Sequence, residues 1–373
     1  MKIPPFVAIV CGVAPLCVFA RNANSPFQPA AVGGKGTDVL LQEKLKGGVA
    51  PAFGGEYESS YGYTTDRRAK TTARKTTRAK YDEFHFPYRP KFPAHPELGL
   101  CRLEDFDFGE EDRLGKGGFG QVFKAQHTKT GRTVAIKFTS ADSIKAKPKH
   151  VENEETIQRI LNHKYIGQLL CTMRNKKNDI FFVLEYFAGG NLVKQLATQF
   201  PLSRQLMIKY VAQMVLALRY IHSHCIVYRD LKAENIMIDE DDNIRFIDYG
   251  LSAYDCENKL DSMAGTPAYL APEVAGRRPY GRAADWHSLG ILVYVLQMNR
   301  LPYRHKKDKK DEFVKDIAEG KLRVSKTGDS QVDELIAVLT EFNWETRWKK
   351  VHVEFESFKK LAFFGDLDWT LYE

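Results

Sequence analysis

Two acidic residues and one amide at fixed spacing are the strongest chemical signal in the chain. Asp230 is followed by Lys232 and Asn235, and Asp248 comes thirteen residues after Asn235. The residues between them, 236–247, predict an apolar strand, a polar turn and a second apolar strand. Such a hairpin would hold a carboxylate and an amide at one end and a second carboxylate at the other. This arrangement suits phosphoryl transfer, which needs a base near the acceptor hydroxyl and oxygen ligands for magnesium.

A glycine-rich segment precedes these residues in the chain. It reads Leu114, Gly115, Lys116, Gly117, Gly118, Phe119, Gly120, Gln121 and Val122. Glycines let backbone N–H groups approach phosphates, because no Cβ intervenes. The same spacing fits a dinucleotide-binding turn, but that turn needs a helix next. Residues 122–125 and 133–138 are β-rich runs around a Thr-Gly turn, so the sequence predicts strand, turn and strand instead.

A lysine and a candidate carboxylate partner follow. Lys137 ends the Val-Ala-Ile-Lys run, 134–137, which suits a lysine that pairs with the α- and β-phosphates. The polar segment 150–161 has helical periodicity and carries several glutamates. Counting back from 163–166, by the family resemblance described below, selects Glu154 as the partner of the lysine, with Glu155 as the alternative. Ile157 and Leu161 then lie on the same inward stripe as Glu154. The alternative is that these glutamates only lie on the solvent-exposed face of a surface helix.

These motifs, in this order, resemble the eukaryotic serine/threonine protein kinases. The catalytic loop of that family matches 228–235, and D-F-G matches 248–250, with tyrosine in place of His and of Phe. Further matches are 265–273, which ends in Ala-Pro-Glu, 285–290, and Arg347 as the partner of Glu273. The resemblance implies a bilobal α+β protein-kinase fold. A β-rich N-lobe with one main helix would span 106–185, and a mostly helical C-lobe would span 190–364.

The resemblance also implies roles for the residues that match. Asp230 would accept or orient the proton of the acceptor hydroxyl, and Lys232 would neutralise the γ-phosphate. Asn235 and Asp248 would hold magnesium, while Lys137 would hold ATP with Glu154 behind it. The other nucleotide contacts would be Leu114, Gly115, Lys116, Gly117, Gly118, Phe119, Gly120, Val122, Ala135, Met237 and the hinge backbone of Glu185 and Phe187.

Two further segments resemble the cyclic-nucleotide-dependent, AGC-type kinases. These are the hinge, 184–192, and the closing segment, 363–369. Glu234 stands where basophilic members of that group place an acid for an arginine of the substrate, whereas Asn191 replaces a second acid. We therefore expect a mild preference for basic peptides. The chain ends at Glu373, so we expect no long regulatory tail.

The segment 248–273 contains few hydroxyls that could order it. Ser262 lies near the usual activating phosphosite, and Arg229 could pair with its phosphate. Alternatively, Asp261 or Glu257 could meet Arg229 without any phosphate, which would leave the enzyme constitutively active. Thr266 is expected to contact Lys232 and Asp230 instead of being modified.

The N-terminal region predicts a route through the secretory pathway. Residues 1–20 read as a cleaved signal peptide, with an uncleaved anchor as the alternative. Residues 21–105 are basic, of low complexity and expected to be mostly disordered. Within them, 66–80 is either a solvated linker or an electrostatic arm for an anionic membrane or acidic surface. Nucleic acid is not expected as a partner, because no aromatic residues interleave the basic ones. This layout resembles the secreted rhoptry-type kinases of apicomplexan parasites.

Composition and cysteine content agree with this organisation. The chain has 373 residues and 43% hydrophobic residues, enough for one two-lobed domain followed by a short tail, 365–373. Outside the signal lie four cysteines, Cys101, Cys171, Cys225 and Cys256. Their even number permits disulfides in an oxidising compartment, but spacing assigns no pairing. Cys225 approaches the catalytic loop, where we expect a small, buried apolar side chain.

Two rival classes of function remain. A secreted pseudokinase or nucleotide-binding scaffold would normally lack the lysine, the catalytic aspartate or the metal aspartate, and none is missing here. A kinase-fold enzyme for a small molecule or sugar would not need the peptide platform that 265–273 predicts. Protein substrates, ATP and Mg²⁺ are therefore the expected partners, and the sequence does not indicate an oligomeric state.

Overall fold

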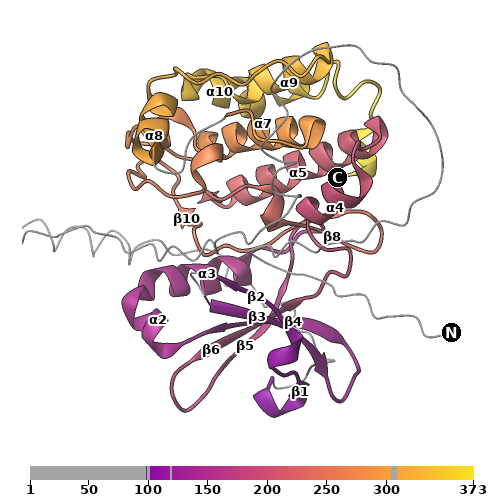
Figure 1. The fold of residues 1–373 in the computed structure, drawn as a ribbon, viewed down its shortest axis with the longest axis vertical. Helices are drawn as coiled ribbons and strands as arrows, with labels where there is room; N and C mark the ends of the chain where they lie inside the picture. The colour runs from indigo at the N-terminus through magenta and orange to yellow at the C-terminus, as the bar shows by residue number, and fades with distance from the viewer. Residues whose placement is uncertain (1–97, 99–100, 118–119, 304–308) are drawn as a thin grey trace, which may run out of the picture.

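The computed structural model describes residues 98, 101–117, 120–303 and 309–373, which form a mostly β lobe and a larger, mostly helical lobe (Figure 1). The predicted signal peptide, the basic segment 66–80, and Gly118 and Phe119 of the glycine-rich loop lie outside the described residues. Among the helices that are described, none combines the length and hydropathy that crossing a membrane requires.

The N-lobe is built on one antiparallel sheet of six strands. The strands pair in the order β1-β3-β4-β6-β5, and β2 lies beside β3. The central strand β4 is flanked on both sides, and its residues 134–137 are all buried. Both faces of the strand are therefore covered, as its unbroken apolar sequence predicts. The bounds are β1 Phe106–Asp107, β2 Arg113–Gly117, β3 Gly120–His127, β4 Thr133–Thr139, β5 Leu169–Arg174 and β6 Ile180–Glu185.

The two faces of this sheet are covered differently. Helix α3 (Pro148–Ile160) begins with a proline, whose missing N–H costs nothing at that position, and it buries Val151 against β5 and β6. A short helix, α2 (Ala141–Ala146), precedes it. The other face carries Leu98 and the chain around Cys101, in a cluster with Phe106. A disulfide between Cys101 and Cys171 ties this segment to β5.

The C-lobe is organised around two long helices. Helix α5 (Arg204–Ser223) begins at Ser203, whose hydroxyl accepts the N–H of Leu206 at 3.2 Å. The apolar stripe that the sequence predicts for this helix is buried throughout: Met207, Val211, Met214, Val215, Leu218 and Ile221. The stripe is therefore core and no binding groove.

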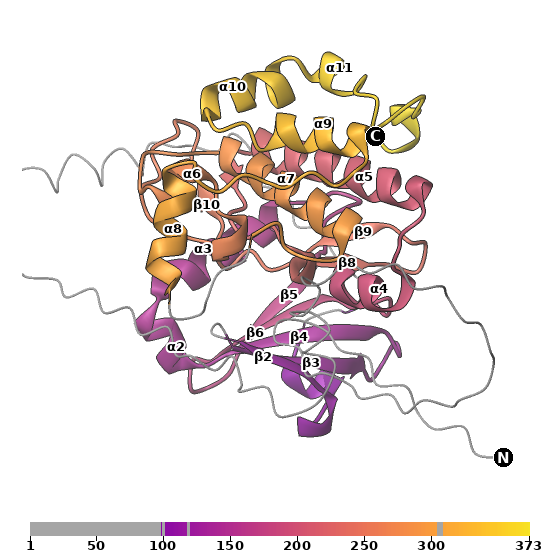
Figure 2. The ribbon, with the colours of Figure 1, turned by 45° about the horizontal axis from the view of Figure 1, so that its top comes forward.

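Helix α7 (Ala283–Met298) is buried around almost its whole circumference. It packs between α5 and α9, with α10 close to it (Figure 2). A helix that is apolar all round must be enclosed by others. The remaining helices are α4 Leu192–Gln199, α6 Pro272–Ala275, α8 Lys310–Ala318, α9 Ser330–Leu339, α10 Trp344–Trp348 and α11 Phe355–Phe358. The predicted bilobal α+β fold is confirmed.

Two small hairpin-like pairs lie where the lobes meet. Strands β8 (Ile236–Ile238) and β9 (Ile244–Phe246) form the predicted strand, turn and strand. Asp239 closes their turn by accepting the N–H of Asn243 at 2.8 Å. Strands β7 (Ile226–Val227) and β10 (Ala253–Tyr254) form a separate antiparallel pair. The second pair joins the segment before the catalytic loop to the segment after Asp248.

Candidate active site

Asp230 is the centre of a hydrogen-bond network. Its Oδ1 accepts the hydroxyl of Thr266 at 2.8 Å, and its Oδ2 accepts Lys232 Nζ at 2.7 Å and Asn235 Nδ2 at 3.0 Å. Lys232 Nζ also donates to Thr266 Oγ1 at 3.1 Å. The contact of Thr266 with Lys232 and Asp230 is the one expected from the sequence. The carboxylate is thus held in place and already accepts a hydrogen bond from an alcohol.

The backbone that presents Asp230 rests on a buried carboxylate of α7. Asp285 accepts the N–H groups of Tyr228 and Arg229, each at 2.8 Å, and the ring of His222 at 2.8 Å. Arg229 lies in the left-handed region, with φ of 71°, which is costly for a residue with a Cβ. The three hydrogen bonds to Asp285 hold this turn. The network positions Asp230 without touching its side chain.

A second network surrounds Asp248. Lys137 Nζ lies 2.5 Å from Glu154 Oε1 and 3.1 Å from Asp248 Oδ1. Glu155 instead binds Arg159 at 2.7 Å, so the structure brings Glu154 to the lysine. Gly250 packs closely against this cluster, because a Cβ there would lie 3.3 Å from Asp248 Oδ1 and 3.4 Å from Glu154 Oε2.

The three charges of this cluster set one another's pKa values. Burial lowers the pKa of Lys137, but the charges of Asp248 and Glu154 outweigh it, and the pKa is raised. Burial opposes ionisation of Asp248, yet Lys137 holds the pKa of that carboxyl below its usual value. For Glu154, burial and the charge of Asp248 raise the pKa despite the lysine. Lys137 and Asp248 therefore stay charged at neutral pH.

Asn235 and Asp248 have the chemistry that magnesium requires. Asn235 uses its NH₂ group to hold Asp230, and this leaves its carbonyl oxygen for a ligand. Asp248 binds Lys137 and the N–H of Gly250 through Oδ1, which leaves Oδ2. Hard oxygen donors from two side chains, completed by phosphate oxygens and water, are a usual magnesium environment. The residues present therefore fit the ion.

The predicted nucleotide contacts gather between the lobes. Phe187 and Met237 are buried in one cluster with Leu114 of β2 partly packed against it. Ala135 faces Leu184 across the β4–β6 pair, one residue before the hinge. Strand β2 contains Leu114, Gly115, Lys116 and Gly117, and β3 begins with Gly120 and includes Val122.

Gly120 shows why this loop needs glycine. Its φ of 136° suits a residue without a side chain, and a Cβ would lie 2.0 Å from the carbonyl oxygen of Phe138. In the hinge, the N–H of Glu185 donates to the carbonyl of Gln168 at 3.1 Å, so this N–H is already used within the protein.

Two buried tyrosines replace the histidine and phenylalanine that the family usually carries. Their rings stack edge-to-face, with centroids 5.4 Å apart, so the packing survives both replacements. The phenol of Tyr228 donates to the carbonyl of Ile247 at 2.5 Å. Among the described residues, the phenol of Tyr249 finds no hydrogen-bond partner. Burial raises the pKa of both phenols well above the usual value, so both stay protonated.

The activation segment, residues 248–273, is held at several points. The Arg229 guanidinium lies 3.3 Å from Ser262 Oγ and 3.4 Å from Tyr280 Oη, and Glu257 pairs with Lys259. At its far end, buried Glu273 pairs with Arg347, as the motif predicts. The contribution of Tyr280 was not predicted, because a tyrosine outside every motif gives no signal in one sequence.

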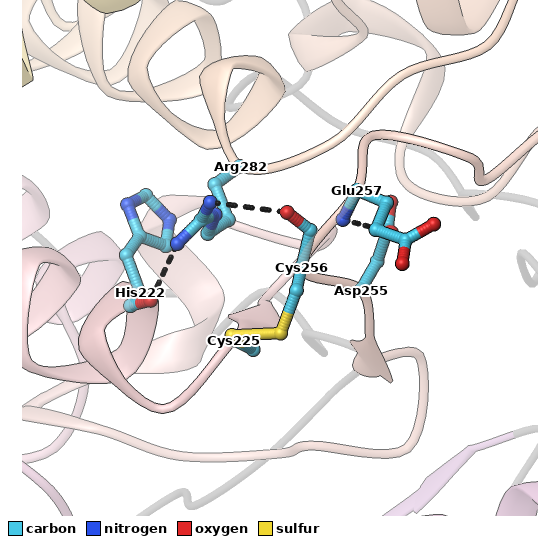
Figure 3. The surroundings of a disulfide bond; sticks show 6 residues. All are labelled: His222, Cys225, Asp255, Cys256, Glu257 and Arg282. Carbon is cyan, nitrogen blue, oxygen red and sulfur yellow. Dashed lines mark hydrogen bonds between the residues drawn. A yellow bond between two sulfur atoms is a disulfide. The ribbon is translucent and has the colours of Figure 1, made fainter. Parts of the chain in front are cut away.

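The expectation for Cys225 is wrong. Cys225 is only half-buried and forms a disulfide with Cys256 (Figure 3). Its backbone is left-handed, with φ of 56°, directly between α5 and β7. The β7–β10 register then brings Asp255 opposite Cys225, and Cys256 follows one residue later. No spacing rule identifies this pairing, because the contact depends on two strands of two residues each.

Comparison with known proteins agrees with this geometry. The family model for the protein kinase domain matches residues 108–358. CBL-interacting protein kinase 11 of Oryza sativa subsp. japonica is 37% identical over 198 residues, which cover 51% of this chain and 39% of that protein. Ribosomal protein S6 kinase alpha-6 of Mus musculus is 32% identical over 282 residues, covering 74% of this chain and 36% of that protein. Ribosomal protein S6 kinase alpha-1 of Homo sapiens is 30% identical over 282 residues, covering 74% and 38%.

The chain spans less than half the length of these curated relatives. Two of these relatives are S6 kinases, which agrees with the predicted resemblance to AGC-type kinases. The match to the family model extends over more than half of the chain, and the residues that define the family converge between its two lobes. The chain therefore belongs to the protein kinase family, among the eukaryotic serine/threonine kinases.

Proposed function

We propose that this chain transfers the γ-phosphate of ATP to serine or threonine of protein substrates. The observation that carries the proposal is the Asp230 network, in which one carboxylate accepts hydrogen bonds from an alcohol, a lysine and an amide. An acceptor hydroxyl in the position of the Thr266 hydroxyl would be oriented for attack, and Asp230 would take its proton. Lys232, 2.7 Å from Asp230, would neutralise charge on the phosphate that moves.

Nucleotide binding would be divided between the lobes. Magnesium supplies charge neutralisation at the phosphates when it is bound, and Asn235 and Asp248 would be its protein ligands. Lys137 would contact the phosphates, and Glu154 holds its ammonium group in place. The cluster around Met237 and Phe187 would enclose the base.

The site itself favours a catalyst over a pseudokinase scaffold. The lysine, both aspartates and the asparagine are present, Asp230 contacts Asn235, and Lys137 contacts Asp248. A small-molecule kinase is disfavoured because Thr266 and Glu273 tie the ends of the peptide-platform segment into the lobe. Both alternatives remain outcomes of the test below.

We further propose a mild preference for an arginine in the substrate. Glu234 stands beside Asp230 in the chain, and its Oε2 is buried without a hydrogen-bond partner among the described residues. A buried carboxylate oxygen gains much from a charged donor. Asn191 supplies no second charge, because its amide is neutral, and its side chain caps α4 by accepting the N–H of Lys194 at 3.1 Å.

We propose that the protein enters the secretory pathway. Support comes from the predicted signal, 1–20, and from the two disulfides, which persist in oxidising compartments. A secretory organelle like the rhoptry, and contact of 66–80 with an anionic membrane or acidic surface, belong to the same proposal. Secretion of a tagged chain from a eukaryotic cell, compared with a chain lacking 1–20, tests it.

The transferase activity is tested with radiolabelled ATP, magnesium, and generic basic and acidic proteins. Label in serine or threonine of a protein, absent with Asp230→Ala, is the expected result. Nucleotide binding without any transfer would instead indicate a pseudokinase, and label only in small molecules or sugars would indicate the third class.

A further inference from the structure

We propose that the Cys225–Cys256 disulfide holds the activation segment in its productive shape, so that transfer depends on the oxidised state of these two cysteines. The proposal rests on the proposed kinase function and adds redox control to it. The disulfide joins residues 31 apart in sequence, and the loop that it closes contains Asp230, Lys232, Asn235 and Asp248. The base and both proposed metal ligands thus lie in one covalent ring.

The bond lies at the start of the activation segment that crosses the C-lobe. Before it, β10 pairs with β7, and the N–H of Asp255 donates to the carbonyl of Cys225 at 2.7 Å. This register places Cys256 next to Cys225. The disulfide therefore extends a two-residue ladder by a covalent link. A ladder this short would fray easily without support from its neighbours.

Beyond the bond, the segment is held by hydrogen bonds near the surface, by the Glu257–Lys259 ion pair and by the contact of Arg229 with Ser262. Asp255 accepts three backbone N–H groups, the shortest from Lys259 at 2.8 Å, and these form a compact turn. Leu260 and Tyr280 then exchange backbone hydrogen bonds, and the phenol of Tyr280 donates to Ser262 at 2.8 Å. Single neutral hydrogen bonds near the surface are individually weak. The disulfide is the only covalent anchor among the described residues between Asp248 and Thr266.

The same surroundings make the bond reversible. Cys256 is exposed and Cys225 half-buried, so a thiol in solution can reach the sulfur atoms. Arg282 donates to the carbonyl of His222 at 3.1 Å and to that of Cys256 at 3.5 Å (Figure 3). These two bonds do not involve sulfur. They would keep the cysteines close after reduction and favour renewed pairing.

The chemical step is thiol–disulfide exchange. A dithiol reductant attacks one sulfur as its thiolate, which breaks the Cys225–Cys256 bond and forms a mixed disulfide. Its second thiol displaces the protein sulfur, and the reductant becomes a cyclic disulfide. Two electrons pass to the protein, and each cysteine sulfur ends with one proton. In an oxidising compartment the reverse exchange, with a disulfide-bearing oxidant, would restore activity.

Reduction should affect transfer more than nucleotide binding. Thr266 comes directly after the segment that would loosen, and its hydroxyl binds Asp230. Lys137 and Glu154 instead belong to the N-lobe. We expect kcat to fall about tenfold on reduction, because the segment must then be ordered at each turnover. The Kd for magnesium-ATP should change less than about twofold.

The experiment uses the full oxidised and unphosphorylated chain, before and after treatment with dithiothreitol. Alkylation and mass spectrometry identify which cysteines are reduced at each dose. The double variant Cys225→Ser with Cys256→Ser should have the low activity of the reduced chain and ignore the reductant. The matched control, Cys101→Ser with Cys171→Ser, removes the other disulfide and should keep both the activity and its sensitivity to reductant.

Full activity in a chain whose Cys225 and Cys256 are shown to be reduced would overturn the proposal. If the double variant does not fold, the dose series on the parent chain decides, because it compares the remaining activity with the alkylated fraction of Cys225 and Cys256 in one protein. If the oxidised chain transfers no phosphate at all, the proposed function fails separately. Amide hydrogen exchange over 256–266 then tests the ordering alone: faster exchange after reduction supports it, and unchanged exchange overturns it.

Discussion

The chain that enters the β8–β9 hairpin carries Asp230 and the chain that leaves it carries Asp248, and the two aspartates are stabilised by different interactions. At one end, Asp230 is held by an alcohol, an amide and a partly exposed lysine. At the other end, Asp248 shares a lysine with Glu154, and the lysine and the glutamate are almost completely buried. The first end is a hydrogen-bond network, whereas the second is a group of compensating charges.

This difference teaches which functions can be separated by mutation. In the first network Lys232 is partly exposed, so it can turn to water when a partner is removed. In the second cluster Lys137 and Glu154 are buried, and removing either one leaves an uncompensated charge at a cost of several kcal/mol, whereas removing Asp248 leaves them paired and takes away a proposed metal ligand. Changes at the Asp230 end should therefore affect catalysis alone, and changes at the Asp248 end should affect binding and stability together.

The largest separation is expected from Asp230→Ala. Loss of the general base should lower kcat by about 10²–10⁴-fold, with Kd for magnesium-ATP within about twofold of the parent. Steady-state kinetics and calorimetric titration measure the two quantities. Asp241→Ala, in the exposed turn of the same hairpin, is the matched control and should change neither. Activity that survives in Asp230→Ala would remove Asp230 from the mechanism.

Asp248→Ala should show the opposite pattern. We expect Kd for magnesium-ATP to rise about thirtyfold, the equivalent of roughly 2 kcal/mol for a lost charge-assisted ligand. Binding of ATP without magnesium should change much less, because Lys137 keeps Glu154 as its partner. Titrations with and without the metal distinguish these cases. Equal magnesium dependence in parent and variant would contradict the metal role of Asp248.

The two stacked tyrosines give a comparison within the core. Tyr228→Phe removes the donor to Ile247 and should lower the free energy of unfolding by about 1–3 kcal/mol. Tyr249→Phe removes a buried phenol without a described partner and should raise the free energy of unfolding by about 1 kcal/mol. Denaturant titration of both variants measures the difference. Destabilisation by both would mean that Tyr249 has a partner in solution.

The raised pKa of Glu154 predicts how nucleotide binding changes with pH. Burial and Asp248 raise this pKa, so Glu154 gains its proton at a higher pH than an ordinary glutamate. Acidification from pH 7 to 5 should then weaken magnesium-ATP binding about fivefold, equivalent to ~1 kcal/mol of lost positioning of Lys137. Glu154→Gln is neutral at pH 7 and at pH 5, so its affinity for magnesium-ATP should be lower than that of the parent and should change less between these pH values. An equally steep loss in the variant would assign the effect to another group.

The smallest effect is expected near the acceptor. Glu234→Gln should reduce the preference for arginine-containing peptides about threefold, since one of the two usual acids is already missing. Competition between arginine and alanine peptides measures the ratio, with Glu240→Gln in the exposed turn as control. A parent enzyme that prefers acidic residues at that position would overturn the basophilic assignment.

Much of this arrangement could be predicted from the sequence, where short contiguous motifs encode local geometry. The β8–β9 hairpin and the buried stripe of α5 follow from spacing and period, whereas the contact of Thr266 with Lys232 was implied by the resemblance to protein kinases. The choice of Glu154 over Glu155 also came from the resemblance, and its place on the inward face of a helix agreed with it. Features that join distant segments were not predictable in this way. The pairing of Cys225 with Cys256, and the support of Arg229 by Tyr280, depend on how short strands meet in three dimensions.

The ring closed by Cys225 and Cys256 has a consequence for how the protein is degraded. The turn at Glu240–Asp242 is exposed and acidic, and it lies inside the ring. A protease that cuts this turn would break the backbone but not divide the molecule, because sulfur still joins the two pieces. Such a nicked chain would migrate as one species until a thiol is added and then separate into two fragments. A cleaved protein could therefore persist in an oxidising compartment and come apart only on arrival in a reducing one.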